Sequence, residues 1–374
     1  MLTIITKMLN RLNIKYMRDF LATIIVFILF ATTLFAQDPD RVYTQASDLT
    51  LAGKLFYDTP NPYHRVDTVR FKGFTSGENT QVRCTSGLSV LFKTDSKSIS
   101  LRTAYGYQSN GDNTMGLALR GFDLYIMKDG RWLHAATKSG KDLQDVVLIK
   151  DMDDSMKECL LYLPLYSELY SLEIGVDKGA SIEALPSPFR HRVGIFGSSF
   201  TQGISCSRPG MTYPAQFTRP TGIQLLSLGC SGNCKLQPYF AEVLKSADVE
   251  ALVFDAFSTP GAEMINDRLF AFIESIQESH PDIPLIFMQT IHRGSTHFNL
   301  STRQSEQEKR DMAEKLMKEA CRKYKNVYFI HPCANNERHE TSVDGTHPDN
   351  YGYTLWADSI EKPICRILKK YGIR

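Results

Sequence analysis

Two adjacent serines stand where an apolar segment gives way to a polar one. The segment is "GIFGSSFTQG", residues 194–203, with Ser198 and Ser199 at its centre. A serine between a strand and a helix lies near free backbone N–H groups, which stabilise developing negative charge. Such a serine can act as a nucleophile, although serines in this position more often serve as helix caps. The segment by itself leaves both interpretations open.

A second polar segment supplies a carboxylate and an imidazole. In "VDGTHPDNYGY", residues 343–353, Asp344 precedes His347 by three positions, with a glycine between them. One tight turn brings the two side chains together, so that the aspartate can orient the histidine and the histidine can accept a proton from a serine. The alternative is an Asx-type turn with a solvent-exposed histidine. The two segments together favour the catalytic interpretation.

Two further segments carry candidate binding groups. Gly229, in "SLGCSGN" (227–233), can present a backbone N–H without a side chain in the way, as an oxyanion donor requires. A simple turn glycine explains the same position equally well. His292 and Arg293, in "QTIHRGSTHF" (289–298), are candidates for contact with substrate, and the alternative there is a polar loop.

The first half of the chain has the pattern of short β-strands. Alternating or continuous apolar runs of strand length recur without a long helical period, and Asp129-Gly130 indicates a hairpin turn. We therefore expect a β-sandwich. The runs are residues 89–94, 98–103, 122–127 and 171–176.

The pattern changes after the proline-rich "LPSPF" (185–189), because buried apolar runs then alternate with helical stretches. This alternation predicts a parallel five-stranded sheet with helices on both faces. Ligands bind beyond the carboxyl ends of such strands, and the candidate segments follow these runs. The expected strands are 192–197, 223–229, 251–257, 284–290 and 326–332, and the clearest helices are 268–280 and 305–324.

Composition and the N-terminus restrict the class of protein. The 374 residues are 43% hydrophobic and 22% charged with a net charge of +2, so there is no electrostatic case for a nucleic-acid partner. Arg18 precedes an apolar run, residues 20–36, that ends in alanine, which is typical of a cleavable signal peptide. A retained membrane anchor is the alternative. We expect a signal peptide over 1–36, a β-sandwich domain over 37–185 and an α/β domain over 186–374, in a periplasmic or secreted protein.

Cysteine and histidine spacings give no metal signature. The eight cysteines are too few for a disulfide scaffold in a chain of this size. Cys230 and Cys234 can pair with each other or with Cys206, and the sequence does not decide between these pairings. The nine histidines include no HExxH motif. We therefore expect no metal and no other cofactor.

The polar segments, in this order, resemble the blocks of the SGNH/GDSL hydrolase superfamily, which are serine esterases with a flavodoxin-like three-layer fold. The resemblance implies that Ser199 is the nucleophile, with Ser198 in the place of the family's aspartate. It assigns Asp344 and His347 as the remaining members of a triad. It also implies that the backbone N–H groups of Ser199 and Gly229 form part of the oxyanion hole. A G-x-S-x-G motif, typical of α/β-hydrolases, is absent.

The first half resembles the jelly-roll-like N-terminal domain of a two-domain bacterial esterase group named for G-x-D-L-Y. The resemblance rests on "GFDLY" (121–125) and on residues 161–176. The role of Asp123 and Tyr125 does not follow from the sequence. An aspartate on such a strand is either solvated or in contact with the other domain.

One block departs from the superfamily. Its third block supplies an asparagine that donates to the oxyanion, but in "VFDAFSTPG" (253–261) the corresponding position is Thr259, with Ser258 beside it. Asn233 belongs to the preceding block. A hydroxyl group donates one hydrogen bond, so we expect a weaker third donor.

These features predict an exported serine esterase that forms an acyl-enzyme and needs no cofactor. The expected substrates are short acyl esters, above all acetyl esters, on carbohydrates. An acyltransferase with the same triad and a non-catalytic glycan-binding protein are the alternatives. After signal cleavage we expect no stable membrane insertion. The sequence does not determine the acyl group, the alcohol or the oligomeric state.

Overall fold

A computed structural model describes residues 41–374 of the chain. The expected signal peptide, residues 1–36, and its cleavage site lie outside the described residues. Within the described part, none of the helices is both long enough and apolar enough to cross a membrane.

The first half folds into two antiparallel sheets. One has the strand order β1-β9-β4-β7, and the other has the order β10-β3-β8-β5-β6, with β2 paired to β3. Two short helices, α2 (Ser76–Arg83) and α3 (Gly116–Arg120), lie between strands. The strands are β1 (Arg41–Gln45), β2 (Thr50–Ala52), β3 (Ser89–Thr94), β4 (Ile99–Gln108), β5 (Phe122–Lys128), β6 (Arg131–Lys138), β7 (Val146–Ile149), β8 (Lys157–Tyr162), β9 (Ser167–Asp177) and β10 (Ile182–Ala184).

The period-2 pattern of the sequence accounts for the core of this half. Leu172 and Ile174, on one face of β9, are fully buried together with Leu101 of β4 and Leu161 of β8. Strands β5 and β6 form the expected hairpin around residues 129–130, which both have positive φ angles of 51° and 74°. Asp-Gly suits this turn because glycine, and to a lesser degree aspartate, tolerates that conformation.

The second half contains a five-stranded parallel sheet of order β12-β11-β13-β14-β15. Strand β11 comes first in the sequence of this half but second in the sheet, between β12 and β13, which is the flavodoxin-like order. The predicted α/β fold class is therefore confirmed. The strands are β11 (Arg190–Gly197), β12 (Ile223–Gly229), β13 (Ala251–Asp255), β14 (Leu285–Met288) and β15 (Val327–Ile330).

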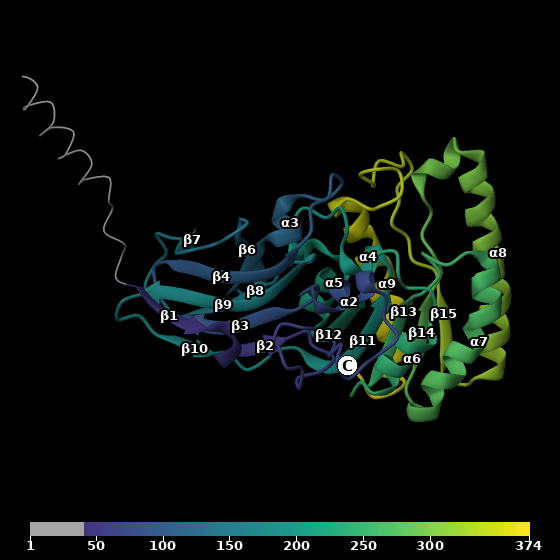
Figure 1. Cartoon of the computed structure of the whole chain (residues 1–374), viewed down its shortest axis with the longest axis horizontal. Coiled ribbons are helices and arrows are strands. Elements are labelled where there is room, and N and C mark those ends of the chain that lie inside the picture. Colours follow the sequence, from purple (N-terminus) through teal and green to yellow (C-terminus); the bar gives the residue numbers. More distant parts are fainter. Residues whose placement is uncertain (1–40) are drawn as a thin grey trace, which may run out of the picture. The chain divides into compact units, whose positions relative to one another are not determined.

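Helices cover both faces of this sheet (Figure 1). One face packs against α6 (Pro238–Lys245), α7 (Ala262–Ser279) and α8 (Leu300–Lys323), and these elements share one apolar core. The other face packs against α5 (Tyr213–Thr221) and α9 (Asn350–Lys369), around a stacked Tyr213–Trp356 pair whose ring centroids are 4.4 Å apart.

The register of the sheet brings three strand ends together. Gly197, the last residue of β11, pairs with Gly229 of β12 and with Asp255 of β13. The short helix α4 (Ser199–Gln202) begins directly after β11. Residues that follow these three strands therefore share one edge of the sheet, as a parallel arrangement requires.

Asp123 and Tyr125, from the GFDLY segment, join the two halves. Asp123 is fully buried, and its Oδ2 accepts hydrogen bonds from Arg208 Nη1 and the Gly210 N–H, both at 2.8 Å. Arg208 also donates to the Tyr125 hydroxyl at 2.6 Å. Burial would raise the pKa of Asp123, but His134, Arg208 and the Gly210 N–H outweigh it and lower that pKa. The segment is thus an inter-domain contact.

A second buried charge, Arg65, caps the edge strand of the parallel sheet. Its guanidinium donates to the carbonyl oxygens of Ser227 and Gly229 at the end of β12, at 3.3 and 2.9 Å. It also donates to the carbonyl oxygens of Gln81 and Cys84. A fully buried guanidinium has many donors to satisfy, and here backbone carbonyls from both halves accept them.

All eight cysteines are free. Cys206, Cys230 and Cys234 are fully buried, and none of the pairings considered from the sequence is formed. Burial raises the pKa of Cys230 to about 11, so this thiol remains protonated and behaves as a core residue.

We predict that Asp123→Asn lowers the free energy of unfolding by about 3 kcal/mol, because it leaves the Arg208 guanidinium without its counterion. The lowered pKa means that the carboxylate stabilises the fold above about pH 4, so the difference from wild type narrows as the pH falls below that value. Denaturant unfolding at several pH values measures this. Asp129→Asn, in the exposed β5–β6 turn, is the matched control, and equal stability of the two variants would contradict the prediction.

Candidate active site

The two adjacent serines have different surroundings. Ser198 is the N-cap of α4: its hydroxyl accepts from the Phe200 N–H at 3.2 Å and donates to Asp255 Oδ2 at 2.6 Å. Ser199 is 9% exposed, and within residues 41–374 its hydroxyl has no hydrogen-bond partner. The Ser198 hydroxyl is therefore occupied by structural hydrogen bonds, whereas the Ser199 hydroxyl is free to react.

Asp255, at the end of β13, organises this turn. It is buried, and its carboxylate accepts hydrogen bonds from the Ser198 N–H at 3.1 Å, from Thr201 Oγ1 at 3.0 Å and from the Ser258 hydroxyl. Burial raises its pKa even though these hydrogen bonds oppose the shift. Asp255 was not predicted as a site residue from the sequence, although a lone aspartate that ends an apolar strand is a signal that could have identified it.

Asp344 and His347 form the expected pair in the loop before α9. His347 Nδ1 lies 2.7 Å from Asp344 Oδ2, and Asp344 Oδ1 accepts the backbone N–H of His347 at 2.8 Å. Gly345, between them, has a φ of 78° that permits the tight turn. With Nδ1–H donated to the carboxylate, the Nε2 lone pair of the imidazole is left to act as a base.

The structure brings this pair next to the nucleophile candidate without a direct bond. The His347 ring meets the Phe200 ring edge-on, with centroids 5.5 Å apart, and Phe200 directly follows Ser199. No hydrogen bond joins Ser199 and His347 among the described residues. Catalytic hydrogen bonds are often long before substrate binds, so the arrangement is compatible with proton transfer.

Asn113, from the first half of the chain, supports the pair. It lies between β4 and α3, and its Nδ2 donates to Asp344 Oδ2 at 2.9 Å. Burial would raise the pKa of Asp344, but hydrogen bonds from Asn113 and His347 outweigh it and lower that pKa well below the usual range. Asp344 therefore remains ionised wherever an imidazole can act as a base. Asn113 was not predicted from the sequence, because 231 positions separate it from its partner.

Gly229 is held tightly against α4. A Cβ there would lie 2.3 Å from the Gln202 nitrogen, so only glycine fits. Its N–H donates to Ser227 Oγ at 3.3 Å and is thus engaged in this structure. Gly232, on the turn after β12, is exposed with a φ of 71° and open space on its Cβ side. The turn is attached to α4 through Ser231 N–H and Gln202 Oε1, 2.8 Å apart.

Ser258 and Thr259 differ in availability. Ser258 is 3% exposed and its hydroxyl donates to Asp255. Thr259 is half-buried, and its hydroxyl has no partner in the described part of the chain. Of the two candidates for the third oxyanion donor, Thr259 is the one with a free hydroxyl.

His292 and Arg293, the candidate substrate contacts, point to different places. Arg293 pairs with Glu306 at 3.3 Å, donates to the Ser258 carbonyl, and places its guanidinium over the Phe200 ring at 5.7 Å. Arg293 therefore packs beside the turn that carries Ser198 and Ser199. His292 instead groups with two other histidines, with ring centroids 5.0 Å from His297 and 5.5 Å from His339.

Two family matches cover most of the described chain. Residues 41–182 match the GxDLY family, described as the N-terminus of SGNH-hydrolase-type esterases, and residues 190–365 match the GDSL-like Lipase/Acylhydrolase family. A search among curated proteins found no match.

Solved structures are similar over both halves. A GDSL-like lipase from Bacteroides ovatus is 35% identical over 88% of this chain and 98% of its own, with a TM-score of 0.85. The salicylyl-acyltransferase SsfX3 from a tetracycline biosynthetic pathway is 20% identical over 91% of this chain and 100% of its own, with a TM-score of 0.64. The acetyl xylan esterase Est2A from Butyrivibrio proteoclasticus is 12% identical over 89% and 100%, with a TM-score of 0.52.

We predict that Asn113→Ala lowers kcat by about tenfold with little change in KM, because the Asp344–His347 pair loses orientation while the substrate site is kept. Steady-state kinetics on a p-nitrophenyl ester measure this. Asn110→Ala is the matched control, since that side chain lies on the same loop and contacts Arg120 instead. A rise in KM at constant kcat would contradict a positioning role.

Proposed function

We propose that this chain, which belongs to the GDSL-like lipase/acylhydrolase family and is a carboxylic ester hydrolase, is an exported serine esterase that removes short acyl groups, above all acetyl groups, from carbohydrates. The observation that carries the mechanism is the 2.7 Å contact between His347 and Asp344 beside the unbonded Ser199 hydroxyl.

In the proposed reaction, Ser199 Oγ attacks the ester carbonyl while His347 Nε2 takes its proton. Asp344 holds the Nδ1–H tautomer and stabilises the imidazolium that forms. The protonated His347 then donates its proton to the departing alkoxide, which leaves an acyl-enzyme on Ser199. Water, deprotonated by His347, attacks the acyl-enzyme and releases the acid and the free serine. No cofactor takes part in these steps.

The proposed oxyanion hole starts from the Ser199 N–H at the beginning of α4. Gly229 was the second donor expected from the sequence, but its N–H already contacts Ser227 Oγ. On this segment, the second oxyanion donor is therefore one of two backbone N–H groups. It is either that of Gly229, once it is released from Ser227, or that of Gly232, whose surroundings are open. Thr259, with its free hydroxyl, supplies the third donor.

Carbohydrate and acetyl specificity are supported by two lines of argument. An acetyl xylan esterase shares the architecture of both halves, which makes a similar substrate class a reasonable extension to this chain. The apolar run after Arg18 supports export, where polysaccharides are available as substrates. The acyltransferase SsfX3 shares the same architecture, so transfer to an alcohol acceptor is the competing outcome to be tested.

A fluorophosphonate should add once to the wild-type protein, because only an activated serine reacts. We predict that intact-mass analysis shows one adduct on wild type and on Ser198→Ala, and none on Ser199→Ala. Ser198→Ala is the adjacent-serine control, and circular dichroism verifies its fold. An adduct that persists on Ser199→Ala, or is absent from wild type, would contradict the assignment of the nucleophile.

Thr259→Ala should lower kcat by about 100-fold, because one oxyanion donor is lost. Thr259→Ser keeps the hydroxyl group and should retain most of the activity, and Thr259→Asn should match or exceed wild type. The measurement is kcat on p-nitrophenyl acetate. An alanine variant as active as wild type would remove Thr259 from the oxyanion hole.

Substrate class is tested with p-nitrophenyl esters of increasing chain length and with acetylated xylan. We expect the highest kcat/KM for acetate and release of acetic acid from the polysaccharide. Preference for long chains would contradict the short-acyl proposal. Formation of a new ester when sugar acceptors are added, in place of free acid, would establish the transferase instead.

A further inference from the structure

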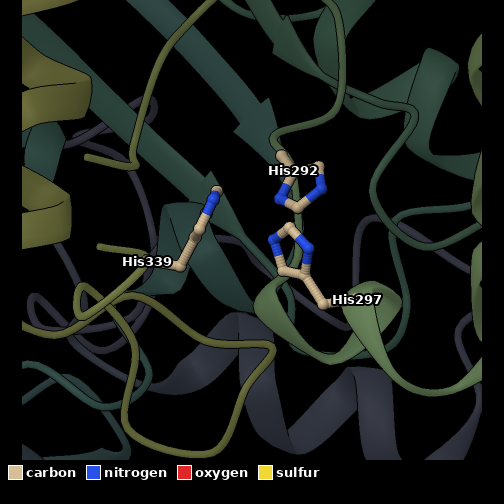
Figure 2. A group of neighbouring side chains, drawn as sticks. All are labelled: His292, His297 and His339. Carbon is tan, nitrogen blue, oxygen red and sulfur yellow. The ribbon is translucent and has the colours of Figure 1, made fainter. Parts of the chain in front are cut away.

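Three histidines from two loops meet outside the proposed triad. His292 and His297 lie between β14 and α8, and His339 lies between β15 and α9. One ring nitrogen from each lies within 4.8 Å of the other two, and all three residues are exposed. Figure 2 shows the three rings around one common space, with the nitrogen-bearing end of His339 toward the other two.

We propose that His292, His297 and His339 bind one divalent transition-metal ion such as Zn²⁺. Imidazole nitrogens suit Zn²⁺, Cu²⁺ and Ni²⁺, whereas Mg²⁺ and Ca²⁺ prefer oxygen ligands, and the group contains no carboxylate. Two nitrogens bound to tetrahedral zinc at about 2.05 Å lie roughly 3.4 Å apart. The nitrogens lie within 4.8 Å of one another, so they would have to approach by at most about 1.4 Å to reach that spacing, and all three side chains are exposed.

Surrounding residues orient two of the rings, and His292 has the hydrogen-bond acceptor that metal-binding histidines usually have. His292 Nε2 lies 3.1 Å from Thr296 Oγ1, whose own proton goes to the Arg293 carbonyl at 2.7 Å. The hydroxyl therefore accepts Nε2–H and fixes the tautomer whose Nδ1 carries the lone pair; that lone pair accepts from Asn335 Nδ2 in this structure and would bind a metal in its place. Asn335 Nδ2 lies within hydrogen-bond distance of Nδ1 of both His292 and His339, so one side chain spans the two loops.

The loop that carries His297 is also fixed. The Arg303 guanidinium donates to the carbonyl oxygens of Thr296 and His297 at the short 3-10 helix Gly294–His297. Three protein ligands leave a fourth position for water or an anion.

The position of the site relates it to the proposed triad. The two loops already meet through the Ser295 N–H and the Gly345 carbonyl, 2.9 Å apart, and Gly345 lies between Asp344 and His347. An ion bound to all three histidines would tie together the loops at this point. The site thereby stabilises the segment that carries the Asp344–His347 pair, independently of whether that pair is catalytic.

Zinc titration of the chelator-treated protein by calorimetry tests the proposal. We expect one saturable ion per chain in wild type, and an affinity lower by roughly 100-fold or more in His297→Ala and in His339→Ala, since a direct ligand is worth more than the 10–100-fold of an outer partner. His331→Ala is the matched control, because this exposed histidine pairs with Glu314 away from the group. It should bind zinc as wild type does.

A second measurement separates loss of binding from loss of folding. The two histidine variants should have wild-type Tm values in the presence of chelator, and only wild type and His331→Ala should gain several degrees when zinc is added. Co²⁺ in place of Zn²⁺ should give visible absorption bands that the two variants lack. Absence of saturable binding to wild type, or unchanged affinity in both His297→Ala and His339→Ala, would overturn the proposal.

Discussion

The buried carboxylate of Asp123 is the constraint on which the arrangement of the two halves depends. A charge inside the protein is tolerated only when hydrogen bonds and a counterion compensate for lost hydration. Asp123 finds them in Arg208 and in the Gly210 N–H, which belong to the segment after α4. The β-sandwich is thereby fixed to the segment that follows the candidate nucleophile.

This attachment gives the sandwich a part in the site. Asn113 can reach Asp344 only because the β4–α3 loop is held over the α/β half, and the resulting hydrogen bond keeps the carboxylate ionised and oriented. Arg65 works in the same way at the sheet edge, where its guanidinium binds the last carbonyls of β12. Both residues belong to the first half of the chain. The first half therefore helps to position residues of the candidate site through these hydrogen bonds.

The site combines a rigid part and a less rigid part. Ser199 lies between buried neighbours, with Asp255 satisfying Ser198, Thr201 and Ser258 beneath it. Asp255 of β13 thus supplies a carboxylate to this turn, whereas the superfamily pattern has its aspartate at the position of Ser198. The Asp344–His347 pair lies instead on a half-exposed loop held by a few hydrogen bonds. Catalytic hydrogen bonds are often long before substrate binds, which is compatible with the lack of a direct bond between Ser199 and His347 among the described residues.

The sequence alone determined the fold class, the family resemblance and the Asp344–His347 turn. Those features are local: strand and helix periods, Asp-Gly at 129–130 and a three-residue spacing each act within a few residues. Their physical basis is the backbone geometry of short segments, which local residue types control.

Only the tertiary structure decided which serine is free, which hydroxyl of Ser258 and Thr259 is available, and that Asp123 joins the halves. It also revealed Asn113 beside Asp344 and the three histidines. Each of these depends on partners distant in the chain, such as Ser198 with Asp255 or His297 with His339. Sequence spacing carries no information about such pairs, because packing of the sheet edge and its loops brings them together.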